Sequence, residues 1–286
     1  MQTELFFSGI SLGGVYGITA LGLALVLNVF GIANLGHGAI MIAGPLMLIC
    51  AINPKAFGPF GYLYLFILAL ALWFTWRFGF RLFSEGQHDN SSKRGMGILV
   101  MGLGLINLVE ELGGKLFTGG VIFLDYQKSI PGFDISIPRA FAVSFSVITC
   151  VLTHMFLKYT DAGRCILAVS QNPQAATMLG IRQQGINLIV FGYSVIITMF
   201  SGVILASIVP LSPFWSLDFT IKALLIVGLA RPLKITDIVF ISFALGCLEV
   251  LIGYYLAEEM RNVITYVTFI AMLISREKLI FKYEKA

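Results

Sequence analysis

The stretch that decides the fold is residues 9–38, "GISLGGVYGITALGLALVLNVFGIANLGHG". It opens with an apolar run long enough to cross a bilayer, for which a helix needs about 20 residues. Gly9, Gly13 and Gly17 recur at every fourth position, so they share one side of a helix and permit another helix to approach closely in lipid. We predict a tightly packed first membrane span, in contact either with its own bundle or with another chain.

The end of the same stretch, "NVFGIANLGHG", should interrupt the helix. Asn28, Asn34, Gly36, His37 and Gly38 are polar or flexible residues in a run that is otherwise helical in character. Broken helices at membrane depth are tolerated where their backbone faces protein or a water-filled cavity, and such breaks often line substrate paths. Two interpretations stay open: Asn34 and His37 line a transport path together with Asn28 and Gly38, or a hydrogen-bonded histidine fixes the turn.

The composition places the whole chain in a membrane. Of the 286 residues, 58% are hydrophobic and only 12% are charged, and the mean hydropathy is +0.90, which lies outside the range of soluble domains. We predict an all-α polytopic membrane protein with about eight to nine transmembrane helices, some of them short or broken. The expected runs are roughly 5–29, 39–53, 60–82, 97–114, 138–157, 186–209, 219–230, 236–257 and 263–280. The second and seventh are too short to cross comfortably.

The distribution of positive charge predicts the orientation. Lysine and arginine mark the cytoplasmic side of short loops. With the N-terminus outside and the C-terminus cytoplasmic, most basic residues lie inside, Lys222 lies within a run, and the outside holds only Lys55, Lys115, Lys128, Arg139 and Arg261. The acidic Glu4 before the first apolar run indicates an uncleaved span rather than a signal peptide. The four cysteines lack the spacing of a metal site, and nothing suggests nucleic-acid binding.

A second stretch is polar within this apolar chain: residues 163–181, "GRCILAVSQNPQAATMLGI". Asn172 suits an N-cap, Pro173 suits the first helical position, and Gly180 is placed to end the helix. The segment therefore predicts a compact, capped helix at the cytoplasmic surface. An ordinary amphipathic linker is the alternative.

Two charges fall within apolar runs. Glu249 lies near the middle of its run and Lys222 inside the short seventh run. Burying a carboxylate in a membrane is costly, so it marks a functional candidate. Glu249 is expected either to pair structurally with Lys222 or to bind a substrate amine on the translocation path, and the sequence does not separate these alternatives.

Several stretches together resemble the permease subunits of ATP-binding-cassette importers of the branched-chain amino acid type, a family that also includes urea and amide permeases. The first is the opening of residues 9–38, with its glycine-rich helix and N-x-x-H-G break. The second is the polar stretch of residues 163–181. The third is "IKALLIVGL" at 221–229, followed by "LGCLEVLIGYYLAEEMRNVITYVTFIAMLI" at 245–274. The resemblance covers nearly the whole chain.

The resemblance implies a single transmembrane permease domain over 1–286, with a cytoplasmic coupling segment at 159–185 that docks on an ATPase. It assigns ATPase coupling to Gly163, Arg164, Asn172, Gln174, Ala175, Ala176 and Gly180. It further implies two ATPase subunits that bind ATP and Mg, a second and different permease subunit, and an extracytoplasmic solute-binding protein. The expected location is the plasma (inner) membrane of a bacterium or archaeon, and the chain itself is expected to hold no cofactor.

The chain departs from the family pattern in two places. Relatives often carry a basic residue where this chain has Leu167 and an acidic one where it has Gln174. These positions are seven apart and share a face if the helix continues between them, so we predict that a charge pair is replaced by a neutral contact. The second departure is "GLARPLKITDI" at 228–238, where relatives have a glycine-rich turn; it leaves the local path and substrate class open.

Other functions need sequence features that differ from these. No G-x-x-x-x-G-K-[ST] phosphate loop is present, so an importer would need ATP hydrolysis by another polypeptide, and this chain is not expected to be an enzyme. An ATP-independent carrier or channel would use Glu249 as a coupling carboxylate and the polar helix as a linker. A membrane hydrolase would need clustered catalytic groups, but His37, His88 and His154 are on separate segments. Branched-chain amino acids are the family's commonest substrates, and the altered 228–238 region leaves other small polar solutes open.

Overall fold

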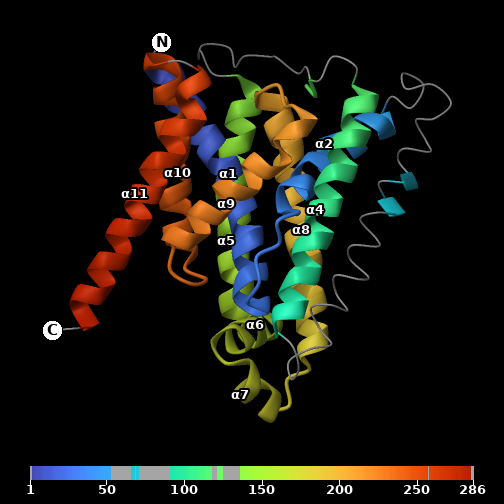
Figure 1. Ribbon diagram of the computed structural model, residues 1–286, viewed down its shortest axis with the longest axis vertical. Helices are drawn as coiled ribbons and strands as arrows, with labels where there is room; N and C mark the ends of the chain where they lie inside the picture. Colours follow the sequence, from blue (N-terminus) through green and yellow to red (C-terminus); the bar gives the residue numbers. More distant parts are fainter. Residues whose placement is uncertain are drawn as a thin grey trace.

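The computed structural model describes residues 2–52, 66–67, 69–70, 91–117, 121–124, 136–256 and 258–284, and they form a helical bundle (Figure 1). Its α-helices are α1 (Gln2–Phe30), α2 (His37–Ile52), α4 (Ser91–Leu116), α5 (Ile137–Tyr159), α6 (Asp161–Gln171), α7 (Pro173–Met178), α8 (Gln183–Ile208), α9 (Ser216–Leu229), α10 (Ile235–Tyr255) and α11 (Glu258–Glu284), with the 3-10 turn η2 (Pro213–Trp215) before α9. The described part contains no strand longer than an isolated bridge, such as that between Ile122 and Leu211. The predicted all-α fold is confirmed.

The helix lengths follow the apolar runs. Among the described residues, five helices are long and apolar enough to span a membrane: Glu4–Phe30, Met96–Leu116, Ile137–Tyr159, Gln183–Ile208 and Ile235–Tyr255. The two short runs form short helices, α2 with 16 residues and α9 with 14. The run expected at 60–82 lies outside the described residues, except for 66–67 and 69–70, which are helical. α4 begins earlier than predicted, at Ser91 rather than near residue 97.

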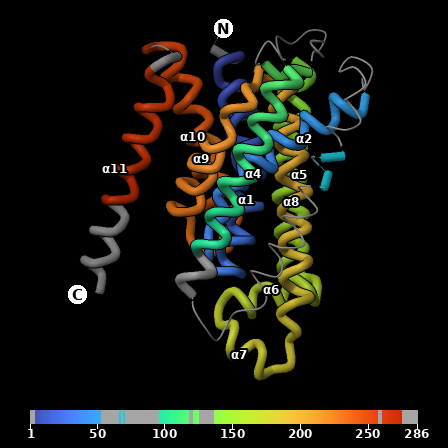
Figure 2. Tube along the Cα trace, turned by 45° about the vertical axis from the view of Figure 1, so that its right-hand side comes forward, coloured from blue at the N-terminus to red at the C-terminus, as the bar shows by residue number. Residues whose placement is uncertain are grey.

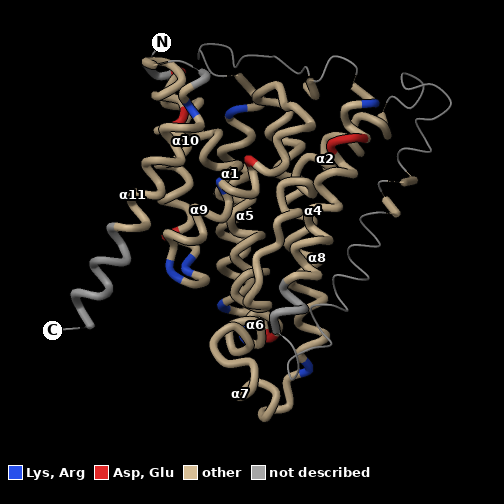
Figure 3. The backbone as a smooth tube through the Cα atoms, viewed as in Figure 1, with Lys and Arg blue, Asp and Glu red and all other residues tan. Residues whose placement is uncertain are grey.

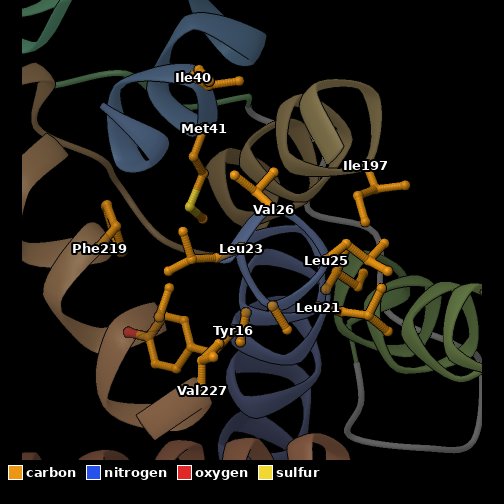
Figure 4. Packing of buried hydrophobic residues seen from close by; sticks show 14 of the residues in the cluster. Tyr16, Leu21, Leu23, Leu25, Val26, Ile40, Met41, Ile197, Phe219 and Val227 are labelled. Atoms are coloured by element: carbon orange, nitrogen blue, oxygen red, sulfur yellow. The ribbon is translucent and has the colours of Figure 1, made fainter. Parts of the chain in front are cut away.

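Helix α1 is the centre of the bundle. It contacts α5, α6, α8, α9 and α10. In its most apolar 18-residue stretch, 89% of the residues are buried. Figure 4 shows Tyr16, Leu23 and Leu25 of α1 among labelled side chains of α2, α8 and α9. A helix that is apolar on all sides is expected in this position, since no face of it needs to meet water or lipid headgroups.

The spaced glycines of α1 set its closest contact, which is with α10. A Cβ on Gly13 would lie 2.6 Å from the carbonyl oxygen of Ser242, and one on Gly9 would lie 2.8 Å from Cys247 Cα. Gly246 of α10 packs against the same part of α1, because a Cβ on it would lie 2.3 Å from the Gly13 nitrogen. The predicted close packing therefore occurs within this bundle.

The two ends of the bundle differ. Helices α6 and α7 project beyond the other helices at the end where α5 finishes and α8 begins (Figures 1 and 2). The N-terminus, the α8–α9 connection and the α10–α11 turn lie toward the opposite end. Figure 3 shows basic residues at both ends of the bundle, and those near α6, α7 and the α9–α10 turn lie at the end that the sequence predicts to be cytoplasmic. We call the α6–α7 end the inner end and the opposite one the outer end.

The glycine contact gives a first prediction. Gly246→Ala should lower the denaturation temperature of the purified protein in detergent, because overpacking of a close backbone contact costs about 1–3 kcal/mol. Gly192→Ala in α8 is the matched control, since nothing lies within 4 Å of its added Cβ. Thermal denaturation followed by light scattering or size-exclusion measures both. Equal denaturation temperatures for the two variants would contradict the assigned packing.

Candidate functional site

Helix α6 begins the predicted coupling segment and is anchored to the bundle. Thr160 caps it by accepting a hydrogen bond from the Gly163 nitrogen at 3.0 Å. A Cβ on Gly163 would lie 2.1 Å from the carbonyl oxygen of Phe156, so only glycine fits where α6 turns back on α5. Arg164 faces solvent and pairs with Asp161 at 2.7 Å; an exposed pair of this kind adds little stability. Arg164 is therefore available to a partner.

Helix α7 has the local structure predicted for it. Asn172 is its N-cap, with Oδ1 accepting from the Ala175 nitrogen at 3.0 Å, and Pro173 is the first helical residue. Gly180 ends the segment with φ +83°, a conformation that favours glycine. The side chain of Gln183 in α8 donates to the Pro173 carbonyl at 2.6 Å and so ties α7 to the next helix.

The helical face proposed to join Leu167 and Gln174 does not exist. Asn172 has extended backbone, with φ −152° and ψ 98°, and separates α6 from α7. Leu167 is half-buried in α6, whereas Gln174 is exposed on α7. The prediction assumed a continuous helix, and the N-cap role of Asn172 is what breaks it. The neutral residues at 167 and 174 therefore do not form a contact on one helical face.

The C-terminal end of α7 carries exposed apolar side chains, which we call the apolar tip. Met178 is 89% exposed and Leu179 is 80% exposed, while Ala176 on the opposite side is buried. Gln174 and Ala175 are exposed beside them. Large exposed apolar side chains at the end of a tied-down helix are typical of a protein-binding surface. Met178 and Leu179 are not among the predicted coupling residues, although they stand out as apolar residues within a polar stretch.

Lys222 and Glu249, the two predicted buried charges, meet in the outer half of the bundle. Lys222 Nζ donates to Glu249 Oε1 at 2.9 Å, and their side chains are 3% and 1% exposed. They line a cavity of about 310 Å³, which we call the outer cavity. Its lining includes residues of α1, α8, α9, α10 and α11 and the connection between α8 and α9. Within the part of the chain that is described, no group of three His, Cys, Asp or Glu side chains could hold a metal ion.

The pair is part of a larger charged network that the sequence analysis did not find. Asp218 Oδ2 lies 3.0 Å from Lys222 Nζ, and Arg261 Nε lies 3.3 Å from Glu249 Oε1. Tyr16 accepts a long hydrogen bond from Lys222 at 3.4 Å, and Tyr266 donates one to Asp218. Two cations face two carboxylates, so the network carries no net charge. Asp218 was detectable as an acid four residues before Lys222 in one helix, but Arg261 comes from a different helix.

The break after α1 lies beside the middle of that helix. His37 Nε2 is 3.0 Å from the Thr19 carbonyl and 3.0 Å from Thr198 Oγ1. Asn34 Oδ1 accepts from the Gly36 nitrogen at 3.0 Å. The chain from Gly31 to Gly36 thus turns back into the bundle, and α2 starts at the depth of Thr19.

The polar groups of the break are satisfied inside the protein. Thr220 of α9 accepts from the Gly38 nitrogen at 2.8 Å, and a Cβ on Gly38 would lie 1.9 Å from the Ser216 carbonyl oxygen. Asn34 is 4% exposed and His37 is 1% exposed. These contacts support the alternative in which the histidine fixes the turn, and neither residue lines the outer cavity.

Asn28 lies near the inner end, apart from the other predicted path residues. It lines a cavity of about 250 Å³, the inner cavity, with residues of α1, of α9 and of the α9–α10 turn. The departure at 228–238 forms this turn: Arg231 binds Asp237 through two hydrogen bonds of 2.6 and 3.0 Å, and Leu233 has φ +49°. The arginine therefore fixes the turn and also lines the inner cavity.

These features are those of a multi-pass membrane protein with a cavity toward each end of a central helix and a capped helical segment that projects from one end. Residues 5–273 match the protein family described as "Branched-chain amino acid transport system / permease component". The chain belongs to this family of transport permeases.

Similar proteins agree with this assignment. The chain is 23% identical over 285 residues to the high-affinity branched-chain amino acid transport system permease protein LivH of Salmonella typhimurium, covering 94% of this chain and 91% of the relative. It is 22% identical to the protein of the same name in Escherichia coli K12, with the same coverage. No solved structure matches the chain. The family match therefore makes the chain a membrane transport permease component.

The charged network gives a second prediction. Lys222→Met or Glu249→Met alone should lower the denaturation temperature, because removing one partner of a buried ion pair costs about 3–5 kcal/mol. The double variant Lys222→Met with Glu249→Met should recover most of the loss, since it restores a neutral site. Thermal denaturation of the four proteins in detergent measures this. A double variant as unstable as the sum of the two single changes would show that charge balance is not what the pair provides.

Proposed function

We propose that the chain is the permease subunit of an ATP-binding-cassette importer and forms the translocation path for a small polar solute, with branched-chain or other amino acids as the substrate class. The observation that carries the proposal is the capped α6–α7 segment, which presents an exposed apolar tip at the inner end of a permease-family bundle. ATP and Mg would be bound by a separate ATPase subunit, because this chain has no phosphate-binding loop.

The coupling segment is built to transmit force rather than to bend. Its two helices are short, capped and held to α5 and α8 by Gly163 and Gln183. A partner that binds Met178 and Leu179 differently in two nucleotide states would therefore move the bundle rather than a flexible loop. Arg164 and Ala175, both exposed, extend the same surface.

The path follows the contact between α1 and α9. Tyr16 and Lys222 line the outer cavity, and Asn28 and Val227 line the inner one. Between them Ala20, Leu23 and Ile226 are fully buried, which separates the two cavities. We infer that transport opens this packed zone while the two cavities exchange access to the two sides.

The remaining partners are part of the proposal, and the family match supports them only as components of a transport system. A second, different permease subunit, two ATPase subunits and an extracytoplasmic solute-binding protein would complete the importer in a bacterial or archaeal plasma membrane. The substrate class also suits the outer cavity, since its charges balance and its other walls are apolar.

An ATP-independent carrier is the second candidate, and the burial of Glu249 is the observation in its favour. A buried carboxylate can couple solute movement to an ion. Uptake into proteoliposomes distinguishes the two functions: an importer needs the ATPase and internal ATP, whereas a carrier transports with this chain alone.

Disruption of the apolar tip tests the proposal. Met178→Glu should reduce co-purification of an ATPase at least tenfold and abolish ATP-dependent uptake, because a charge placed in a buried apolar contact costs about 2 kcal/mol or more. Affinity purification in mild detergent with mass spectrometry measures the association. Arg164→Glu should act in the same direction.

The matched control is Thr236→Glu, which places the same charge on an exposed residue in the first turn of α10, outside the coupling segment. It should leave co-purification unchanged. If the natural protein purifies without any ATPase, or if Met178→Glu behaves like Thr236→Glu, the coupling role of α7 is wrong and the carrier becomes the favoured function.

A further inference from the structure

Several buried polar atoms beside the outer cavity have no hydrogen-bond partner. Within the described residues, Glu249 Oε2, Asn262 Oδ1 and Arg261 Nε are buried and make no hydrogen bond. Arg261 Nε lies 3.3 Å from Glu249 Oε1 as a charge contact, but the hydrogen bond is not made. Buried polar atoms are almost always hydrogen-bonded, so several unpaired donors and acceptors at one cavity indicate that a ligand could form hydrogen bonds with them.

These atoms offer a defined chemistry. Glu249 Oε2 and Asn262 Oδ1 can only accept hydrogen bonds, and Arg261 can only donate them. A ligand that satisfies all three must carry N–H donors and an acidic or carbonyl oxygen. All three residues line the outer cavity, and the Glu249 side chain is 1% exposed.

Much of the remaining cavity lining is apolar. It includes Leu12 of α1, Leu205 of α8, Leu211 of the connection and Phe219 of α9. The cavity volume of about 310 Å³ falls at the lower end of small-molecule sites, which have mainly apolar walls and a few placed polar groups. A small solute with one charged end and one apolar end fits this lining.

The charge balance of the cavity further restricts which class of solute can bind. The network of Lys222, Arg261, Asp218 and Glu249 is neutral, and a net charge buried in a membrane protein is costly. A zwitterion can separate Arg261 from Glu249 and engage each with its own opposite charge without changing the total. A purely cationic or anionic solute would leave one charge uncompensated.

We propose that the outer cavity is a recognition site for a zwitterionic amino acid with an apolar side chain. Glu249 Oε2 and Asn262 Oδ1 accept from its ammonium group, and Arg261 donates to its carboxylate. The side chain lies against Leu12, Leu205 and Phe219. The inference rests on the proposed permease function and adds a selection step within the membrane subunit itself.

Ligand-dependent thermal denaturation of the purified full chain tests the site. The probes are L-leucine, 2-hydroxy-4-methylpentanoate, in which a hydroxyl replaces the ammonium group, and 3-methylbutylamine, which lacks the carboxylate. L-Leucine should raise the denaturation temperature in a concentration-dependent manner, and the other two should not. An equal rise with all three probes, or no rise with L-leucine, would overturn the proposal.

Asn262→Ala separates recognition from a structural role. It should weaken the apparent affinity for L-leucine about tenfold to a hundredfold, the effect of losing a hydrogen bond to a charged group. In the absence of ligand it should leave the denaturation temperature unchanged or raise it, because it removes a buried unpaired acceptor. A lower unliganded denaturation temperature with unchanged leucine affinity would assign Asn262 a structural role and overturn its place in the site.

Matched controls come from the same chain. Asn107→Ala removes a helical asparagine on α4 whose side chain is exposed, and it should change neither property. Arg261→Gln should lower leucine affinity, whereas Arg139→Gln, in the first turn of α5, should not. Equal effects of Arg261→Gln and Arg139→Gln on affinity would contradict the role of Arg261.

Failure of this site and failure of the permease function give different results. If the assembled importer takes up solute with ATP but L-leucine never stabilises the chain, the recognition site is wrong and the permease function stands. If L-leucine stabilises the chain and Asn262→Ala abolishes the effect, but no ATPase associates, the site stands and the importer assignment fails.

Discussion

Helix α1 is packed by other helices along most of its length, and this packing determines where the other helices and both cavities lie. Its backbone meets that of α10 directly at Gly9 and Gly13, facing Gly246, and its other faces pack on α5, α8 and α9. Lipid supplies no hydrophobic force between helices, so close packing of this kind must hold them together. Because α1 is central, the same helix lines both the outer cavity and the inner cavity, and the zone of Ala20 and Leu23 separates them.

Polar groups in the bundle divide into two kinds. Those of the break, His37, Asn34 and Thr220, are bonded within the protein, as required of irregular backbone at membrane depth. Those of the outer cavity balance in charge, but Glu249 Oε2 and the Asn262 amide oxygen keep unused acceptors. The first kind therefore stabilises the fold, and the second kind is suited to a ligand.

Much of the fold follows from sequence because helix length, breaks and caps are local properties. The residues alone predict the short helices at 37–52 and 216–229, the break at Asn34 and the N-cap at Asn172. The Leu167–Gln174 face was wrong for an equally local reason, since the same cap ends α6. The cavity network was only half predicted: Lys222 and Glu249 stand out as charges in apolar runs, but Arg261 was assigned to an outer loop, and its proximity to Glu249 depends on how α11 packs on α9 and α10.

The two cavities at the ends of the α1–α9 contact are proposed to open in turn under ATP control. Cysteine labelling tests this, with Val209→Cys in the outer cavity and Val227→Cys in the inner cavity, each in a chain without its natural cysteines, within the assembled transporter in proteoliposomes. A membrane-impermeant thiol reagent is applied from each side, with and without ATP and vanadate. Trapping the nucleotide should change the accessibility of the two cysteines in opposite directions. If the two accessibilities stay constant, or rise together, the cavities do not open in turn.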